Sequence, residues 1–185
     1  MNELLEDSRS MAERHNFNFS QNTFGGSLAC NTIATLVACS FADGNIDENN
    51  FKKYCRVGSE IWTKVTGGSK TTSAKEIIDS FDFFRDTYKI EEYQGYYKHE
   101  RDGRISLTDL VTTVQEENDS RAVGLVFTDG CISFAVGKFN QNWVIFDSHS
   151  PNAWIQKSTY EDIVKQIRRN LVLPNIFDAT TIIMK

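Results

Sequence analysis

The sequence predicts an α+β fold in which helices pack on an antiparallel sheet. Two observations predict it. Up to about residue 117, apolar residues recur mainly at the spacing of amphipathic helices, and after residue 121 they form short runs of β-branched and aromatic residues divided by turns. The chain has 185 residues and shows neither a repeat nor a linker that would divide it. We therefore expect a single domain over 1–185.

The helical part is predicted in order from its apolar spacing and its end signals. Ser73 with Glu76 three residues later is a capping box, and Ser106 is expected to cap another helix. Expected helices are a frayed, peripheral one over 1–14, one that begins near Cys30 and ends before Asp43-Gly44, and others over 49–65, 72–88 and 106–117.

The later part of the chain is predicted to be mainly sheet. Three runs rich in β-branched and aromatic residues are separated by Asp129-Gly130 and by Asn140-Gln141-Asn142, which is typical of an antiparallel meander. The expected strands cover 122–128, 131–138 and 143–147, a final strand covers 180–184, and a helix covers 159–170 before Pro174. The segment 89–99 is compatible with one more short strand.

The composition excludes several classes of protein. Hydrophobic residues make up 40% and charged residues 24%, as in ordinary globular proteins. A net charge of −5 without a basic cluster argues against a nucleic-acid partner. No run approaches the ~20 apolar residues of a membrane span, and residues 1–14 do not resemble a signal peptide. We expect a monomer in the cytoplasm, of its own cell or of a host cell, that does not bind membranes.

The four cysteines are candidates for either core packing or nucleophilic chemistry. They lack zinc-ligand spacing, and without a secretory signal disulfides are not expected. Cys39, Cys55 and Cys131 have apolar or mid-helix surroundings and are expected in the core. Cys30 differs because it lies in the first turn of a helix, where unpaired N–H groups and the macrodipole lower the thiol pKa from ~8.5. A half-buried structural role for Cys30 is the alternative.

A substrate path is suggested beside Cys30. Gly25 and Gly26 lie just before it, and a backbone without Cβ atoms can admit an extended substrate chain. Trp154 is a candidate wall of the same slot, with packing in the core as the equal alternative.

Asp147 and His149 are candidates for the base that activates a thiol. They lie at the end of the third strand of the meander, and residues i and i+2 of a strand point to the same face. A carboxylate beside an imidazole keeps one ring nitrogen protonated and leaves the other to pair with a thiol. A solvent-exposed pair that arises by chance is the alternative, and the remaining histidines, His15 and His99, are expected at the surface.

Gln21 and Asn22 are candidates for an oxyanion donor. They precede Cys30 by nine and eight residues, and a side-chain amide can join the Cys30 backbone N–H in binding a developing negative oxygen. Either amide could instead bond its own backbone. A cysteine early on a helix and a histidine late on a strand is the chain order of papain-like enzymes.

Four motifs carry a resemblance to a known family. The segments Ser20-Gln21-Asn22, Gly26 to Asn31, Ile132 to Gly137 and Val144 to Ser150 resemble the deubiquitinase domain of herpesvirus large tegument proteins and their non-viral relatives. The match covers about 15–41 and 122–152. The part over 42–121 does not align and is expected to be a family-variable helical region.

The resemblance implies a papain-like cysteine protease fold with the nucleophile at a helix N-terminus. It implies Cys30 as nucleophile, His149 as general base and then acid, Asp147 as its orienting acid and Gln21 as oxyanion donor. The implied activity is hydrolysis of isopeptide bonds after the C-terminal glycine of ubiquitin, with ubiquitin or its chains as partner and no metal or cofactor. Two alternatives stay open: a papain-like protease, acyltransferase or deamidase that acts on another protein, and an inactive ubiquitin-binding module.

Overall fold

The computed structural model describes residues 14–15, 22, 25–26, 28–96, 105–118, 122–130, 132–149, 153–171 and 176–185. Its helices are α1 (Cys30–Ala42), a 3-10 helix (Glu48–Asn50), α2 (Phe51–Thr66), α3 (Ala74–Asp79), α4 (Asp82–Thr87), α5 (Leu107–Asn118) and α6 (Tyr160–Asn170). Its strands are β1 (Arg14–His15), β2 (Tyr88–Tyr96), β3 (Ile105–Ser106), β4 (Val123–Asp129), β5 (Ile132–Phe139), β6 (Asn142–Phe146), β7 (Trp154–Lys157) and β8 (Ile176–Met184).

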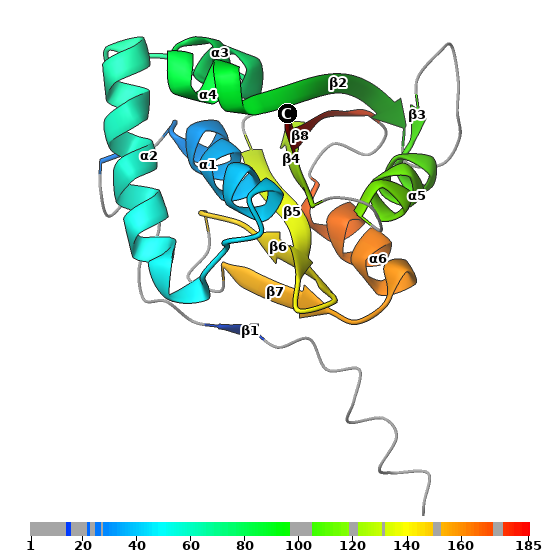
Figure 1. The fold of residues 1–185 in the computed structure, drawn as a ribbon. Coiled ribbons are helices and arrows are strands. Elements are labelled where there is room, and N and C mark those ends of the chain that lie inside the picture. Colours follow the sequence, from blue (N-terminus) through cyan, green and yellow to red (C-terminus); the bar gives the residue numbers. More distant parts are fainter. Residues whose placement is uncertain are drawn as a thin grey trace, which may run out of the picture.

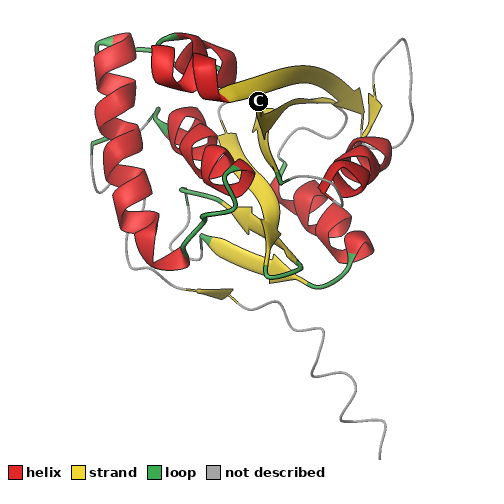
Figure 2. Cartoon of the chain, viewed as in Figure 1, coloured by secondary structure: helices red, strands yellow, loops and turns green. Residues whose placement is uncertain are grey.

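The strands of the described residues form one sheet in the order β1-β7-β6-β5-β4-β8-β2-β3. Neighbouring strands are antiparallel, apart from the parallel pair β2 and β3. Helices α1 to α4 lie on one face of this sheet, and α5 and α6 lie on the other (Figure 1). Figure 2 shows the same arrangement as helices on both sides of a central sheet. The predicted α+β class with a mainly antiparallel sheet is confirmed.

Helix α1 lies very close to the sheet because two strand residues beneath it are glycines. A Cβ at Gly124 of β4 would come within 1.9 Å of the Ala38 carbonyl oxygen, and one at Gly137 of β5 would come within 2.2 Å of the Phe41 ring. These glycines therefore permit the close approach of helix and strands. The approach brings the first residues of α1 to the ends of β4 and β5, where the candidate site lies.

Four of the six predicted helices are confirmed and a fifth is corrected. The helices expected from Cys30, over 49–65, over 106–117 and over 159–170 correspond to α1, α2, α5 and α6. The capping box of Ser73 and Glu76 is also present. The helix expected over 72–88 is instead two short helices, α3 and α4. At their junction the Ser80 hydroxyl donates to the Glu76 carbonyl at 2.6 Å, and the chain is extended at Phe81 (φ −132°).

The extended backbone at Phe81 therefore separates α3 from α4. None of the helices that the structure describes has both the length and the apolar character needed to cross a membrane.

The predicted meander is confirmed as β4, β5 and β6. The strand compatible with 89–99 is β2, so the region over 42–121 is not purely helical. The strand expected over 180–184 is longer and lies inside the sheet, between β4 and β2. Strand β7 was not predicted. Arg14, expected at the end of a helix, pairs with β7 in β1, and the rest of 1–14 lies outside the described residues, as do His99 and Pro174.

Candidate active site

Cys30 is the first residue of α1, as predicted. The chain enters the helix through a turn in which the Ala29 N–H donates to the Gly26 carbonyl at 3.0 Å. The Cys30 side chain is 4% exposed and faces the sheet end, where His149 and Ser133 contact its sulfur. Because a helix N-terminus favours negative charge, this position suits a thiolate.

Several effects compete at the Cys30 sulfur. Burial, the largest of them, raises the pKa of the thiol. A hydrogen bond and the positive charge of His149 lower it, and so do the backbone N–H and the hydroxyl of Ser133. The net result is a Cys30 pKa below its ordinary value. Cys30 is therefore ready to ionise despite being buried.

His149 is held by Asp147 through a turn. Strand β6 ends at Phe146, and Asp147 Oδ1 then accepts from the backbone N–H of His149 at 2.9 Å and from its Nδ1 at 2.8 Å. The two side chains meet as predicted, but the expected cause, the alternation of an extended strand, is wrong. The local bond from an Asp side chain to the N–H two residues later makes the contact instead.

The same hydrogen bonds set the charge of the imidazole. A carboxylate oxygen can only accept, so Nδ1 donates to Asp147 and Nε2 is left for the Cys30 sulfur. The hydrogen bond to Asp147, followed by the one to Cys30, raises the pKa of His149 to about 10, although burial opposes this change. A raised His149 pKa and a lowered Cys30 pKa both favour a thiolate–imidazolium pair.

The other described cysteines lack these partners and behave as core residues. Cys39 of α1 and Cys55 of α2 are buried, as predicted. Burial raises the pKa of Cys55 to about 12 and raises that of Cys39 as well. Both thiols are thus neutral and unreactive. Cys131 lies outside the described residues.

The two glycines before the nucleophile have different roles. Gly25 is exposed and adopts a φ of +74°, which favours glycine. Gly26 is buried, and a Cβ there would come within 2.3 Å of Ser59 Oγ in α2. The prediction that Gly26 lines a substrate path is therefore corrected: its missing side chain makes room for α2. That Gly25 lines a substrate path stays a prediction.

Trp154 is not the wall of a substrate slot. Its side chain is 0% exposed, and its ring centroid lies 4.9 Å from that of Phe51 and 6.4 Å from that of Phe41. It is a core residue between the sheet and α2, which was the alternative considered above. Gln21, the predicted oxyanion donor, lies outside the described residues, and Asn22 is exposed.

Three polar residues of the site were missed by the sequence reasoning. Asn31, Thr128 and Ser133 form a hydrogen-bonded group directly beside Cys30. The available signal was the position of Ser133 in an apolar strand, on the same side as Ala135 and therefore facing α1. A polar residue in such a place needs a partner, and Asn31 in the buried first turn of α1 provides one.

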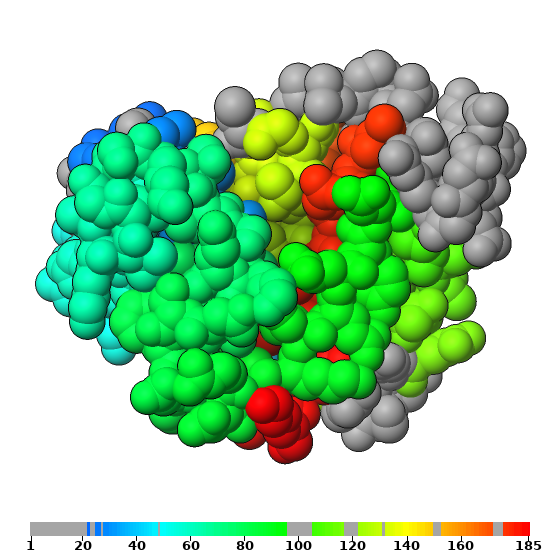
Figure 3. All heavy atoms as spheres, turned by 90° about the horizontal axis from the view of Figure 1, so that it is seen from above, coloured from blue at the N-terminus to red at the C-terminus, as the bar shows by residue number. Residues whose placement is uncertain are grey.

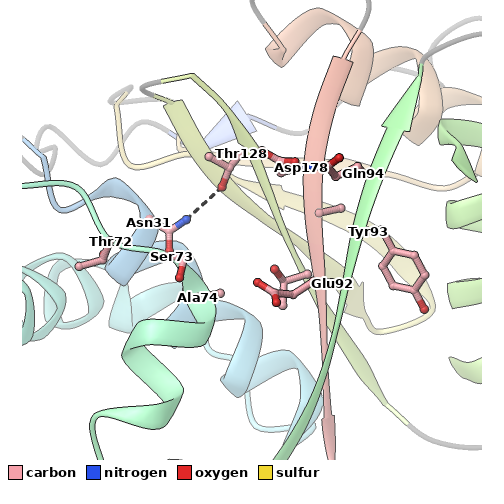
Figure 4. A pocket seen from close by; sticks show the side chains of 11 residues that line it. Asn31, Thr72, Ser73, Ala74, Glu92, Tyr93, Gln94, Thr128 and Asp178 are labelled. Atoms are coloured by element: carbon pink, nitrogen blue, oxygen red, sulfur yellow. Dashed lines mark hydrogen bonds between the residues drawn. The ribbon is translucent and has the colours of Figure 1, made fainter. Parts of the chain in front are cut away.

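A cleft of about 380 Å³ lies beside this group. It runs between the start of α3 and the strands β2 and β8, and Figure 3 shows the hollow between the helices (cyan to green) and these green and red strands. Figure 4 shows Asn31 and Thr128 at one end of it and the carboxylates of Glu92 and Asp178 along its strand side. Both carboxylates are exposed. The cleft is therefore acidic and reaches Asn31, the residue after Cys30.

Comparison with known proteins defines the fold. No protein-family model matches this chain, and no curated protein matches it in sequence. Among solved structures, it resembles the ubiquitin-specific protease encoded by murine cytomegalovirus tegument protein M48, determined in complex with a ubiquitin-based suicide substrate. The TM-score is 0.70 at 12% identity, over 95% of this chain and 86% of that one. The fold is that of a papain-like cysteine protease.

A second similar structure is the Pseudomonas avirulence protein AvrPphB. It aligns with a TM-score of 0.47 at 13% identity, over 96% of this chain and 98% of that one.

Proposed function

We propose that this protein is a cysteine-type deubiquitinase that hydrolyses the isopeptide bond after the C-terminal glycine of ubiquitin. The observation that carries the proposal is the continuous contact from Cys30 through His149 to Asp147, with Nδ1 of His149 2.8 Å from the carboxylate. A nucleophile, a base and an orienting acid in this order are the requirement of thiol proteases. The fold shared with the M48 protease supports the same chemistry.

The proposed first step is acyl transfer to sulfur. The Cys30 thiolate attacks the carbonyl carbon of the glycine, a C–S bond forms, and the carbonyl electrons move to the oxygen. The backbone N–H of Cys30 and the side chain of Gln21 are the proposed donors to this oxyanion. As the C–N bond breaks, the imidazolium of His149 gives its Nε2 proton to the lysine amine, which leaves.

The second step regenerates the enzyme. Neutral His149 takes a proton from water, and the resulting hydroxide attacks the thioester. The C–S bond then breaks and releases ubiquitin with a free carboxylate and Cys30 as thiolate. Asp147 keeps the imidazole in the required tautomer through both steps and stabilises its charged form.

Charge supports ubiquitin as the substrate. The tail of ubiquitin is basic and ends in two glycines, which need little room near the nucleophile. The exposed carboxylates of Glu92 and Asp178 line the cleft that reaches Asn31, the residue after Cys30, so they offer the opposite charge to such a tail. The M48 protease, which has the same fold, was determined with a ubiquitin-based substrate.

A labelling experiment tests the proposal. The protein is incubated with ubiquitin that carries a C-terminal electrophile, in parallel with matching probes made from other modifiers, and the adduct is mapped by mass spectrometry. We expect a ubiquitin adduct on Cys30 that is lost in Cys30→Ala. Cys55→Ala is the matched control: it removes a buried thiol remote from His149, and labelling should persist.

Other outcomes would reject the proposal. An adduct on another cysteine would mean that the nucleophile is misassigned. Tight ubiquitin binding without an adduct would indicate a binding module. A Cys30 that reacts with small alkylating agents but with none of the modifier probes would indicate a protease, acyltransferase or deamidase for another protein. Because Cys30→Ala removes a small side chain, it should cost only about 1 kcal/mol of stability, so lost labelling cannot be attributed to unfolding.

A further inference from the structure

The environment of Cys30 contains a donor beyond the Cys-His-Asp group. Ser133 is the second residue of β5, is 2% exposed, and pairs across the sheet with Thr128 of β4. Asn31, the residue after Cys30, is 5% exposed and reaches down from α1 to both hydroxyls. Three polar side chains from three elements thus meet in a buried place next to the sulfur.

The hydrogen bonds of this group are mutually consistent. Asn31 Nδ2 donates to Thr128 Oγ1 at 3.0 Å, the bond drawn in Figure 4, and to Ser133 Oγ at 3.2 Å. The two hydroxyl oxygens lie 3.0 Å apart. At the other end of the amide, Asn31 Oδ1 lies 3.4 Å from Thr35 Oγ1, whose hydroxyl also has the Asn31 backbone carbonyl as an acceptor at 2.8 Å.

The hydrogen bonds of this group allow the Ser133 hydroxyl to point at Cys30. A hydroxyl has one proton to donate and can accept two hydrogen bonds. Both hydroxyl oxygens accept from Asn31 Nδ2, and in the bond between the two hydroxyls either oxygen can be the donor. When Thr128 is the donor, the Ser133 proton is available to the Cys30 sulfur, which Ser133 also contacts. A bond to a charged acceptor is stronger than one to a neutral hydroxyl, so ionisation of Cys30 favours this arrangement.

We propose that Ser133 is a further catalytic residue, whose hydroxyl donates a hydrogen bond to the Cys30 thiolate, and that Asn31 and Thr128 are positioning residues that aim this proton. The backbone N–H of Ser133 donates to the same sulfur, so one residue supplies two donors. These two neutral donors stabilise the negative charge of the Cys30 thiolate without a second charged residue beside His149.

The charged groups around the sulfur come from few elements. The turn after β6 supplies His149, with Asp147 behind it. The first turn of α1 contains no acidic residue, and β5 contributes the neutral donors of Ser133. Across the cleft, β2 and β8 present Glu92 and Asp178 on the far side of Asn31.

The test measures the thiolate directly. The rate of alkylation of Cys30 by iodoacetamide is followed against pH, with the adduct quantified on the peptide that contains Cys30. In Ser133→Ala the backbone N–H stays and the hydroxyl is lost, and we expect the midpoint of the rate profile to move upward by about one pH unit. Ser133→Thr keeps a hydroxyl and should return the midpoint to that of the unchanged protein.

A second variant keeps the test decisive. Thr128→Val preserves shape but removes the hydroxyl that orients Ser133, so the midpoint should rise by a smaller amount. An unchanged midpoint in a folded Ser133→Ala protein would overturn the proposal. If that variant does not fold, an unchanged midpoint in Thr128→Val would overturn it. Alkylation does not involve ubiquitin, so this test and the ubiquitin-probe test can fail independently. Describing Ser133 as a catalytic residue rests on the proposed function.

Discussion

The reactivity of Cys30 depends on the few atoms that surround its sulfur. Burial acts in the same direction on Cys30, Cys39 and Cys55, and in the last two it leaves neutral thiols. Only at Cys30 do an imidazolium and the donors of Ser133 outweigh it. A buried position with several donors is suited to catalysis, because the donors act in a medium that screens them little.

The contact between Asp147 and His149 leads to a prediction for the pH dependence of the reaction. The hydrogen bond to Asp147 is the main reason that the His149 pKa is raised to about 10. Activity should therefore rise with pH as Cys30 ionises, and this rise should lie below the ordinary pKa of a cysteine thiol. Activity should fall as pH passes about 10, because His149 then lacks the proton for the leaving amine. Asp147→Asn removes the charge, so the alkaline fall should move to lower pH.

The measurement is kcat/KM for a ubiquitin-fluorophore substrate between pH 5 and about 11. In Asp147→Asn we also expect a loss of at least tenfold at neutral pH, since the tautomer is no longer enforced. Asp162→Asn, on α6 at the opposite face of the sheet, is the matched control and should leave the profile unchanged. An alkaline limb that is identical in Asp147→Asn would show that Asp147 does not tune the imidazole.

At the scale of the elements, the position of the nucleophile depends on how closely α1 lies on the sheet. Gly124 lies under backbone atoms of Ala38, so no side-chain rotation could relieve an added methyl group. Gly124→Ala should therefore displace α1 and destabilise the protein by about 1–3 kcal/mol. Because α1 begins with Cys30, the variant should also label more slowly with the ubiquitin probe.

Thermal unfolding and probe labelling check this prediction together. Gly44→Ala is the matched control, because Gly44 has a φ of +66° but no atom within 4 Å of an added Cβ. It should lower the melting temperature through local strain while labelling stays unchanged. A Gly124→Ala protein with unchanged melting temperature and labelling would contradict the proposed role of the close approach.

The elements also show which parts of the site the sequence could predict. Helix spacing placed Cys30 correctly, because an amphipathic pattern and its start signals are local. The contact between Asp147 and His149 could also be predicted, because it lies within one short segment, although a turn and not a strand produces it. Ser133 was missed because its role depends on α1, which packs above the hairpin of β4 and β5, and the contact from Asn31 to Ser133 spans about a hundred residues.

Trp154 was assigned to the wrong environment for the same reason. An aromatic residue that follows a catalytic loop can line a cleft or fill the core, and the difference depends on α2, which contributes Phe51 to the stack around it. The strand β7 that carries Trp154 was not recognised, because four residues are too few for a periodic pattern. The burial of Trp154 therefore depends on how α2 packs against the sheet and not on the local sequence around it.

For the whole molecule, catalysis depends on bringing the layer of helices against the end of the sheet. The helical layer supplies the proposed nucleophile and the turn after β6 supplies the proposed base, and the acidic cleft between α3 and the strands β2 and β8 reaches Asn31 of α1. The substrate would therefore be held by both layers at once. This arrangement separates binding from chemistry, since the carboxylates of the cleft do not act on the sulfur.

That separation predicts the effect of reversing the charge of the cleft. The double variant Glu92→Lys, Asp178→Lys should raise KM for ubiquitin substrates by about fivefold or more, with the larger effect at low salt, because exposed charges act over distance but are screened by ions. Iodoacetamide should still alkylate Cys30 at the normal rate. Steady-state kinetics at two ionic strengths is the measurement.

Glu161→Lys on α6 is the matched control for this variant, since Glu161 is exposed but lies on the other face of the sheet. It changes the net charge without touching the cleft. A KM that responds equally to Glu161→Lys would indicate a general charge effect. A KM that stays constant at low salt in the double variant would exclude the cleft from ubiquitin binding.

The placement of β8 has a consequence for biosynthesis. This strand lies between β4 and β2, which both precede it in the chain, so one edge of each stays unpaired until β8 has left the ribosome. Their other edges can pair earlier, β4 with β5 and β2 with β3. In a nascent chain, chaperones would be expected to cover the open edge of β4 during that interval.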